Sequence, residues 1–128
     1  MNRYEWSLDA LYKGYDDPAF QNDLKQYHDL HDELSALTEE MNTLEECCAV
    51  KEVLRLLEKE YDLSGRLHMY TILRQSVDTN DKQTLQYLNI INSRISSYSV
   101  YRSQLKDYLA HIKHMDSCIQ QDLSLIHI

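Results

Sequence analysis

Residues 18–44 read PAFQNDLKQYHDLHDELSALTEEMNTL, and this stretch decides the fold. Its apolar residues recur at steps of mostly three and four, which places them on one stripe of a helix. They are Phe20, Leu24, Tyr27, Leu30, Leu34, Leu37, Met41 and Leu44. Asp17 and Pro18 mark the start, because proline is tolerated in a first helical turn and a preceding aspartate can accept hydrogen bonds from free amides. The pattern predicts a helix from Pro18 to about Met41.

A second helix is predicted from about Leu44 to Val77. Thr43 and Glu46 have the spacing of a capping box, which would satisfy the amides at its start. Its apolar stripe is wide, which implies two neighbouring helices. The stripe consists of Val50, Val53, Leu56, Leu57, Leu63, Leu67, Tyr70 and Val77. Gly65 interrupts this helix at a cost of about 1 kcal/mol relative to alanine, so we expect either a bend or a close helix contact there.

A third helix is predicted to begin near Lys82. The short polar side chains of residues 78–81 compete for backbone amides, so this segment ends one helix and caps the next. The third apolar stripe has one gap, at Arg102. It consists of Leu85, Leu88, Ile91, Ile95, Tyr98, Leu105, Leu109 and Ile112.

Two short connections make consecutive helices antiparallel neighbours. The sequence therefore predicts an all-α fold in which three long helices run up, down and up after a short irregular lead. We divide the chain into the lead at 1–17, the three-helix region at 18–114 and a tail at 115–128. From about residue 123 the tail resembles the product of reading through a sequencing adapter. An exposed apolar strip is also expected, because the helices are longer than a bundle of this size needs.

Charge and composition exclude several classes of partner. A net charge of −8 repels phosphate backbones and anionic lipids, so we expect neither nucleic acid nor a membrane as partner. No segment approaches the roughly 20 apolar residues that span a bilayer. Three cysteines are an odd number, and Cys47 and Cys48 are adjacent, which favours free thiols in a reducing compartment. These features predict a cytoplasmic protein.

Candidate chemical groups have simpler structural explanations. His28 with His31, and His111 with His114, lie one helical turn apart and could hold a metal with Cys47 or Cys48, but solvated histidines are the commoner reason for such spacing. The cysteines lie near a helix start, where the helix dipole lowers a thiol pKa and the neighbouring glutamates oppose it. The paired carboxylates at 32–33, 39–40 and 45–46 are interpreted as solvated helix faces and caps.

Two blocks of sequence carry a resemblance to a known family. The first block contains Trp6, Leu8, Leu11, Tyr12, Asp17, Pro18 and Phe20. The second contains Tyr70, Leu73, Arg74, Val77, Asp78, Thr79 and Asp81. Together they resemble the N-terminal region of the oligoendopeptidase F family of zinc metallopeptidases. The resemblance spans roughly residues 4–100, and Lys82 departs from it because the family usually has proline there. Arg74 and Asp78 are expected to form a structural ion pair.

The resemblance implies a role in proteolysis without chemistry of its own. These helices would form a wall or lid of a cleft that admits oligopeptides, and their partners would be the remainder of the peptidase and, in the full-length parent, an oligopeptide substrate. In the family, zinc is held by a His-Glu-x-x-His motif, and no His-Glu pair occurs in this chain. We therefore expect no catalytic or metal-binding residue here, and zinc only in the parent. The alternative is a stand-alone helical bundle that acts as an adaptor or dimerisation module.

Overall fold

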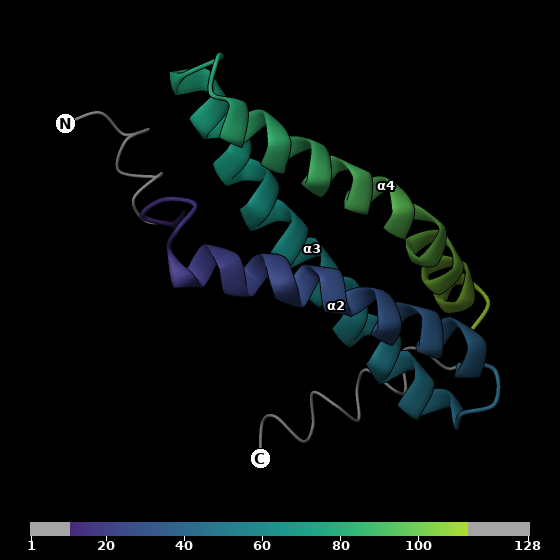
Figure 1. Ribbon diagram of the computed structural model, residues 1–128. Helices are drawn as coiled ribbons and strands as arrows, with labels where there is room; N and C mark the ends of the chain where they lie inside the picture. Colours follow the sequence, from purple (N-terminus) through teal and green to yellow (C-terminus); the bar gives the residue numbers. More distant parts are fainter. Residues whose placement is uncertain (1–10, 113–128) are drawn as a thin grey trace.

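The computed structural model describes residues 11–112, which form three long α-helices. Helix α2 spans Pro18–Glu40, α3 spans Glu46–Val77 and α4 spans Lys82–Ala110. The α2–α3 and α3–α4 connections lie at opposite ends of the bundle, so consecutive helices are antiparallel (Figure 1). Each helix contacts both of the others. The predicted all-α, up-down-up architecture is confirmed, and none of the described helices combines the length and apolarity that crossing a bilayer requires.

Two of the three predicted helix starts are correct. The Asp17 carboxylate accepts a hydrogen bond of 3.0 Å from the Ala19 amide, directly before Pro18. The Asp81 carboxylate accepts from the Gln83 amide at 3.1 Å and from the Thr84 hydroxyl at 2.8 Å. These bonds satisfy donors that have no partner within the helix, and they fix where α2 and α4 begin.

The capping box predicted at the start of α3 is wrong. The capping residue is Glu45, whose carboxylate accepts from the Cys48 amide at 3.0 Å. Thr43 instead donates its hydroxyl hydrogen to the Glu40 carbonyl at 2.7 Å and so closes the end of α2. The four residues between Glu40 and Glu45 are needed to reverse the chain, which leaves Thr43 too early to cap α3.

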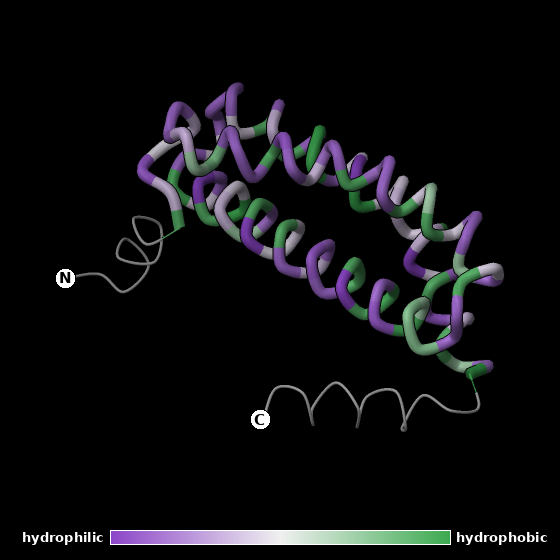
Figure 2. Tube along the Cα trace, turned by 90° about the horizontal axis from the view of Figure 1, so that it is seen from below, coloured by the Kyte–Doolittle hydropathy of each residue, from purple (hydrophilic) through white to green (hydrophobic). Residues whose placement is uncertain are grey.

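The core is formed by the predicted apolar stripes, and Figure 2 shows apolar and polar residues alternating along each helix. Three stripe residues are exceptions: Val77 is 74% exposed, Leu85 39% and Leu44 38%. All three lie at or near a connection, where the stripe has passed the end of its neighbouring helix. Next to Leu85, the inward position is taken by Thr84, whose hydroxyl lies 2.7 Å from that of the buried Tyr15.

Gly65 does not mark a close helix contact. A Cβ atom built on this residue meets nothing within 4 Å, and the residue is exposed. The close-contact explanation is therefore wrong, and the alternative explanation, a bend, stays a prediction.

Candidate functional site

The two family-like blocks meet in one buried aromatic cluster. Ring centroids lie 5.2 Å apart for Tyr12 and Phe20, 5.1 Å for Tyr12 and Tyr70, and 5.7 Å for Phe20 and Tyr70. Tyr15 extends the cluster by stacking on Tyr87 of α4, at a centroid distance of 4.8 Å. Edge-to-face and stacked pairs of this kind each add about 0.5–1.5 kcal/mol beyond their buried area. The cluster therefore holds the end of the lead against all three helices.

Polar bonds fix the same segment. The Tyr12 hydroxyl donates to the buried Asp23 carboxylate at 2.6 Å, and Arg66 of α3 lies 3.1 Å from the same oxygen. Burial, and then the bond to Asp23, raise the pKa of Tyr12 well above its ordinary value. A neutral tyrosine and a paired carboxylate are the forms that burial tolerates. This arrangement anchors the lead and offers no free acid or base.

Arg74 is placed against rings rather than against Asp78. Its guanidinium carbon lies 4.9 Å from the Tyr15 ring centroid, and its Nη1 atom donates to the Tyr70 hydroxyl at 3.3 Å. Its carboxylate partner is Asp81, at 3.8 Å. The predicted Arg74–Asp78 ion pair is wrong, because Asp78 leaves the helix with extended backbone and its carboxylate accepts from the Asn80 amide at 3.1 Å.

The remaining family-like positions have simple environments. Leu11 packs against the core and Leu73 is half-buried, whereas Trp6 and Leu8 lie outside the described residues. Leu11, Tyr12, Phe20 and Tyr70 thus lie in or against the core and Asp17 caps α2, whereas Val77 is exposed.

A buried ion pair between α3 and α4 was not predicted. The Glu60 carboxylate is 3% exposed and pairs with Arg102, whose Nη2 atom also donates to the Ile95 carbonyl at 2.8 Å. The Ser64 hydroxyl donates to the other Glu60 oxygen at 3.3 Å. Arg102 is the gap in the third stripe, and Glu60 lies between Leu56 and Leu63 of the second. The sequence feature that could have predicted this ion pair is the presence of two charged residues at positions that continue apolar stripes.

The described histidines His28, His31 and His111 do not come together with other metal ligands. His31 lies 3.5 Å from Asp32 and 3.3 Å from the Tyr101 hydroxyl, whereas His28 faces a cleft between α2 and α4. The His111 ring lies 2.7 Å from the Asp107 carbonyl, and His114 is outside the described residues. Among residues 11–112, no group of three or more His, Cys, Asp or Glu side chains could hold a metal ion.

The cysteines differ from each other. Cys48 is free and exposed, whereas Cys47 is disulfide-bonded, so the prediction of free thiols is wrong for Cys47. A hydrogen bond and the negative charge of Glu45 raise the pKa of the Cys48 thiol. A raised pKa leaves less thiolate at neutral pH, so Cys48 is a poor nucleophile there.

The outer face of α3 carries four exposed apolar residues. We define it by Leu54, Tyr61, Met69 and Ile72, which are between 37% and 81% exposed. At 100° per residue these four lie on one side of α3, opposite the buried stripe. Contact with another polypeptide would remove these apolar side chains from water. Comparisons of the chain with protein-family models, curated proteins and solved structures return no match.

Proposed function

We propose that this chain is the N-terminal helical region of an oligoendopeptidase F-like zinc metalloendopeptidase, in which it forms one wall or lid of the oligopeptide cleft. The observation that carries the proposal is the meeting of the two family-like blocks. Tyr12 and Phe20 of the first block contact Tyr70 of the second, although about 50 residues separate them in sequence. A shared structural role gives a physical reason for both blocks to occur together in one chain.

The outer face of α3 supports a larger assembly. Tyr61 is 81% exposed and Met69 55%, and each would be stabilised by contact with another apolar surface. We propose that the remainder of the peptidase covers this face, in the cytoplasm, although the disulfide at Cys47 removes the thiol argument for that compartment. The alternative, a stand-alone adaptor or dimerisation module, would use the same face to bind a partner helix.

The proposal assigns zinc to the parent peptidase and not to the described helices. The described residues hold no suitable cluster of ligands, and the sequence contains no His-Glu pair. We therefore derive no catalytic step from these helices. The zinc that the resemblance implies would be held by the remainder of the peptidase.

A substitution on the outer face tests the proposal. Tyr61→Asp should change the stability of the isolated chain by less than about 0.5 kcal/mol, because the residue is exposed there. In the protein made from the continued reading frame, the same change should lower zinc-dependent cleavage of a quenched fluorescent peptide, because it places a charge in an interface. Val100→Asp, at an exposed residue of α4, is the matched control.

Three results would contradict the peptidase proposal. Cleavage by the isolated chain would contradict the absence of catalytic groups. Equal activity of the Tyr61→Asp and Val100→Asp full-length proteins would remove the outer face from the interface. A dimer of the isolated chain that Tyr61→Asp dissociates would favour the adaptor alternative.

A further inference from the structure

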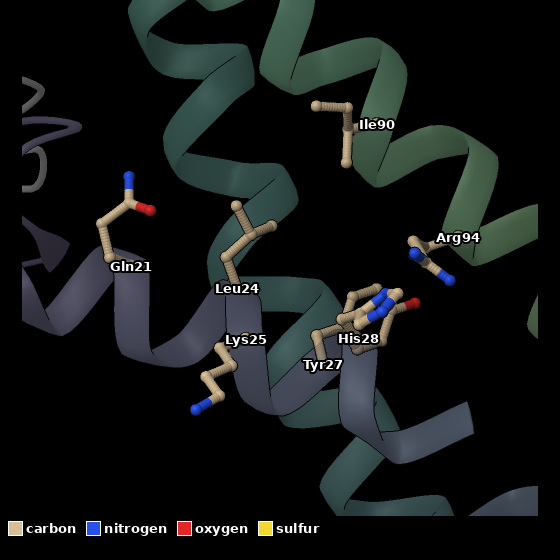
Figure 3. A pocket seen from close by; sticks show the side chains of 7 residues that line it. All are labelled: Gln21, Leu24, Lys25, Tyr27, His28, Ile90 and Arg94. Atoms are coloured by element: carbon tan, nitrogen blue, oxygen red, sulfur yellow. The ribbon is translucent and has the colours of Figure 1, made fainter. Parts of the chain in front are cut away.

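A cleft of about 290 Å³ lies between α2 and α4. These two helices contact each other less extensively than either contacts α3, which leaves space between them. The lining comes from two facing helices, as Figure 3 shows. Helix α2 supplies Gln21, Leu24, Lys25, Tyr27 and His28, and helix α4 supplies Ile90 and Arg94. The volume is just below the usual range for ligand pockets, which begins at about 300 Å³, so a small ligand is the appropriate size.

Arg94 differs from the other arginines of the described chain. Arg55, Arg66, Arg74 and Arg102 each lie within 4.0 Å of a carboxylate. Among residues 11–112, no carboxylate lies within that distance of Arg94, Lys25 or His28. The chain has 21 acidic residues and 13 basic ones, yet the cleft is lined by basic side chains and by no acidic one. The local charge of the cleft is therefore opposite in sign to the net charge of the chain. It is suited to an anion from outside the chain.

The helix carrying Arg94 is fixed against α2. One turn after Arg94, the Tyr98 hydroxyl donates to the carbonyls of Tyr27 at 2.7 Å and His28 at 3.1 Å. Burial raises the pKa of Tyr98, whereas the positive charge of Arg94 and a hydrogen bond from Arg94 oppose that shift. Arg94 comes to the cleft from α4 and His28 from α2 (Figure 3). Figure 3 shows the Lys25 side chain directed away from α4, at the edge of the site.

The rest of the lining favours an apolar ligand body. Leu24 is half-buried and Ile90 is 42% exposed, so both keep surface that a ligand can cover. Gln21 closes one end, because its amide donates to the Tyr15 carbonyl at 2.8 Å and to the Tyr87 hydroxyl at 3.1 Å. Its amide oxygen still has acceptor capacity for a donor on the ligand.

We propose that this cleft binds a small carboxylate that carries an apolar side chain, with the carboxylate between Arg94 and His28 and the side chain on Leu24 and Ile90. The planar guanidinium matches a carboxylate with two parallel hydrogen bonds. An acylated amino acid such as N-acetyl-leucine has the required charge, size and amide donor. The negative net charge of the chain weakens attraction at long range, but salt screens charges beyond about 8 Å under physiological conditions. This inference is independent of the peptidase proposal.

The test is an NMR titration of the whole chain with N-acetyl-L-leucine. Saturable shifts should be confined to the amides that line the cleft, and Arg94→Gln should weaken binding about tenfold or more, as loss of a charge-assisted hydrogen bond does. N-acetyl-L-leucinamide, which lacks the charge, should not bind. Arg55→Gln, on the surface of α3, is the matched control and should leave the affinity unchanged.

Several outcomes would overturn the proposal. Absence of saturable shifts, equal binding of the neutral amide, or an unchanged affinity in Arg94→Gln would each do so. Inorganic phosphate binding as tightly as N-acetyl-leucine would remove the role of Leu24 and Ile90. Should Arg94→Gln fail to fold, His28→Gln provides the second variant, and the comparison of acid with amide in the unmodified chain still decides the question.

Discussion

The buried pair between Glu60 and Arg102 gives the sharpest stability prediction, through the substitution Arg102→Leu. The Glu60 carboxylate is 3% exposed, and without Arg102 it would keep the Ser64 hydroxyl at 3.3 Å. Removing one partner of a buried ion pair costs about 3–5 kcal/mol, because the other charge is left buried and uncompensated. The substitution should therefore lower the free energy of unfolding by about that amount.

The double substitution Glu60→Leu with Arg102→Leu separates the charge effect from packing. Leucine at both positions removes both charges and continues the apolar stripes of α3 and α4. A buried pair replaced by apolar residues is often neutral or stabilising, so the double variant should recover most of the loss. Urea unfolding followed by circular dichroism measures all four members of the cycle. Arg55→Leu is the control, because its pairs are about half-exposed and should contribute less than about 1 kcal/mol.

If Arg102→Leu costs no more than Arg55→Leu, Glu60 is solvated rather than buried, and the predicted charge effect is absent. A double variant as unstable as Arg102→Leu alone would also contradict the prediction. In that case the loss would come from packing or from the bond to the Ile95 carbonyl, and not from an uncompensated charge.

Three further predictions follow from single features. Gly65→Ala should raise the free energy of unfolding by about 0.5–1 kcal/mol, because the new methyl group meets nothing within 4 Å and alanine favours the helix. A lower free energy of unfolding in urea would instead mean that the site is crowded. Burial raises the pKa of Tyr27 to about 12 and also raises the pKa of Tyr98, whereas an unfolded tyrosine titrates near 10. The folded chain therefore holds these protons more tightly, and stability that is complete below pH 10 should decline as the pH rises toward 12; an unchanged urea midpoint across that window would contradict the burial of these hydroxyls. Maleimide should label Cys48 without reductant but Cys47 only after reduction, as peptide mass mapping can show; labelling of Cys47 without reductant would contradict its disulfide. Glu45→Gln should speed the labelling of Cys48 at neutral pH, because the glutamate raises the pKa of that thiol.

Local patterns were sufficient for the helices. The Asp17–Pro18 start and the Asp81 cap depend on side chains that act within three residues, and the apolar stripes depend on helical periodicity alone. Each of these signals lies within a short window of sequence. The start of α3 was predicted less well, because glutamate is a less common capping residue than threonine. Thr43 had the expected spacing to Glu46 but closes the end of α2 instead.

Features that join two helices could not be predicted from one helix at a time. Glu60 and Arg102 each interrupt an apolar stripe, but their pairing depends on the register between α3 and α4. Arg74 meets Tyr15 rather than Asp78, because the aromatic cluster brings the lead beside α3. The cleft beside Arg94 depends on the spacing of α2 and α4, which no local pattern contains.

We propose that these helices belong to a peptidase whose remainder covers the outer face of α3. The nucleotide sequence of the gene beyond the codon for Ile128 tests this proposal. We expect an open frame that continues and encodes a His-Glu-x-x-His motif downstream. A stop codon at that point, confirmed in the messenger RNA, would contradict it and would leave a self-contained helical bundle.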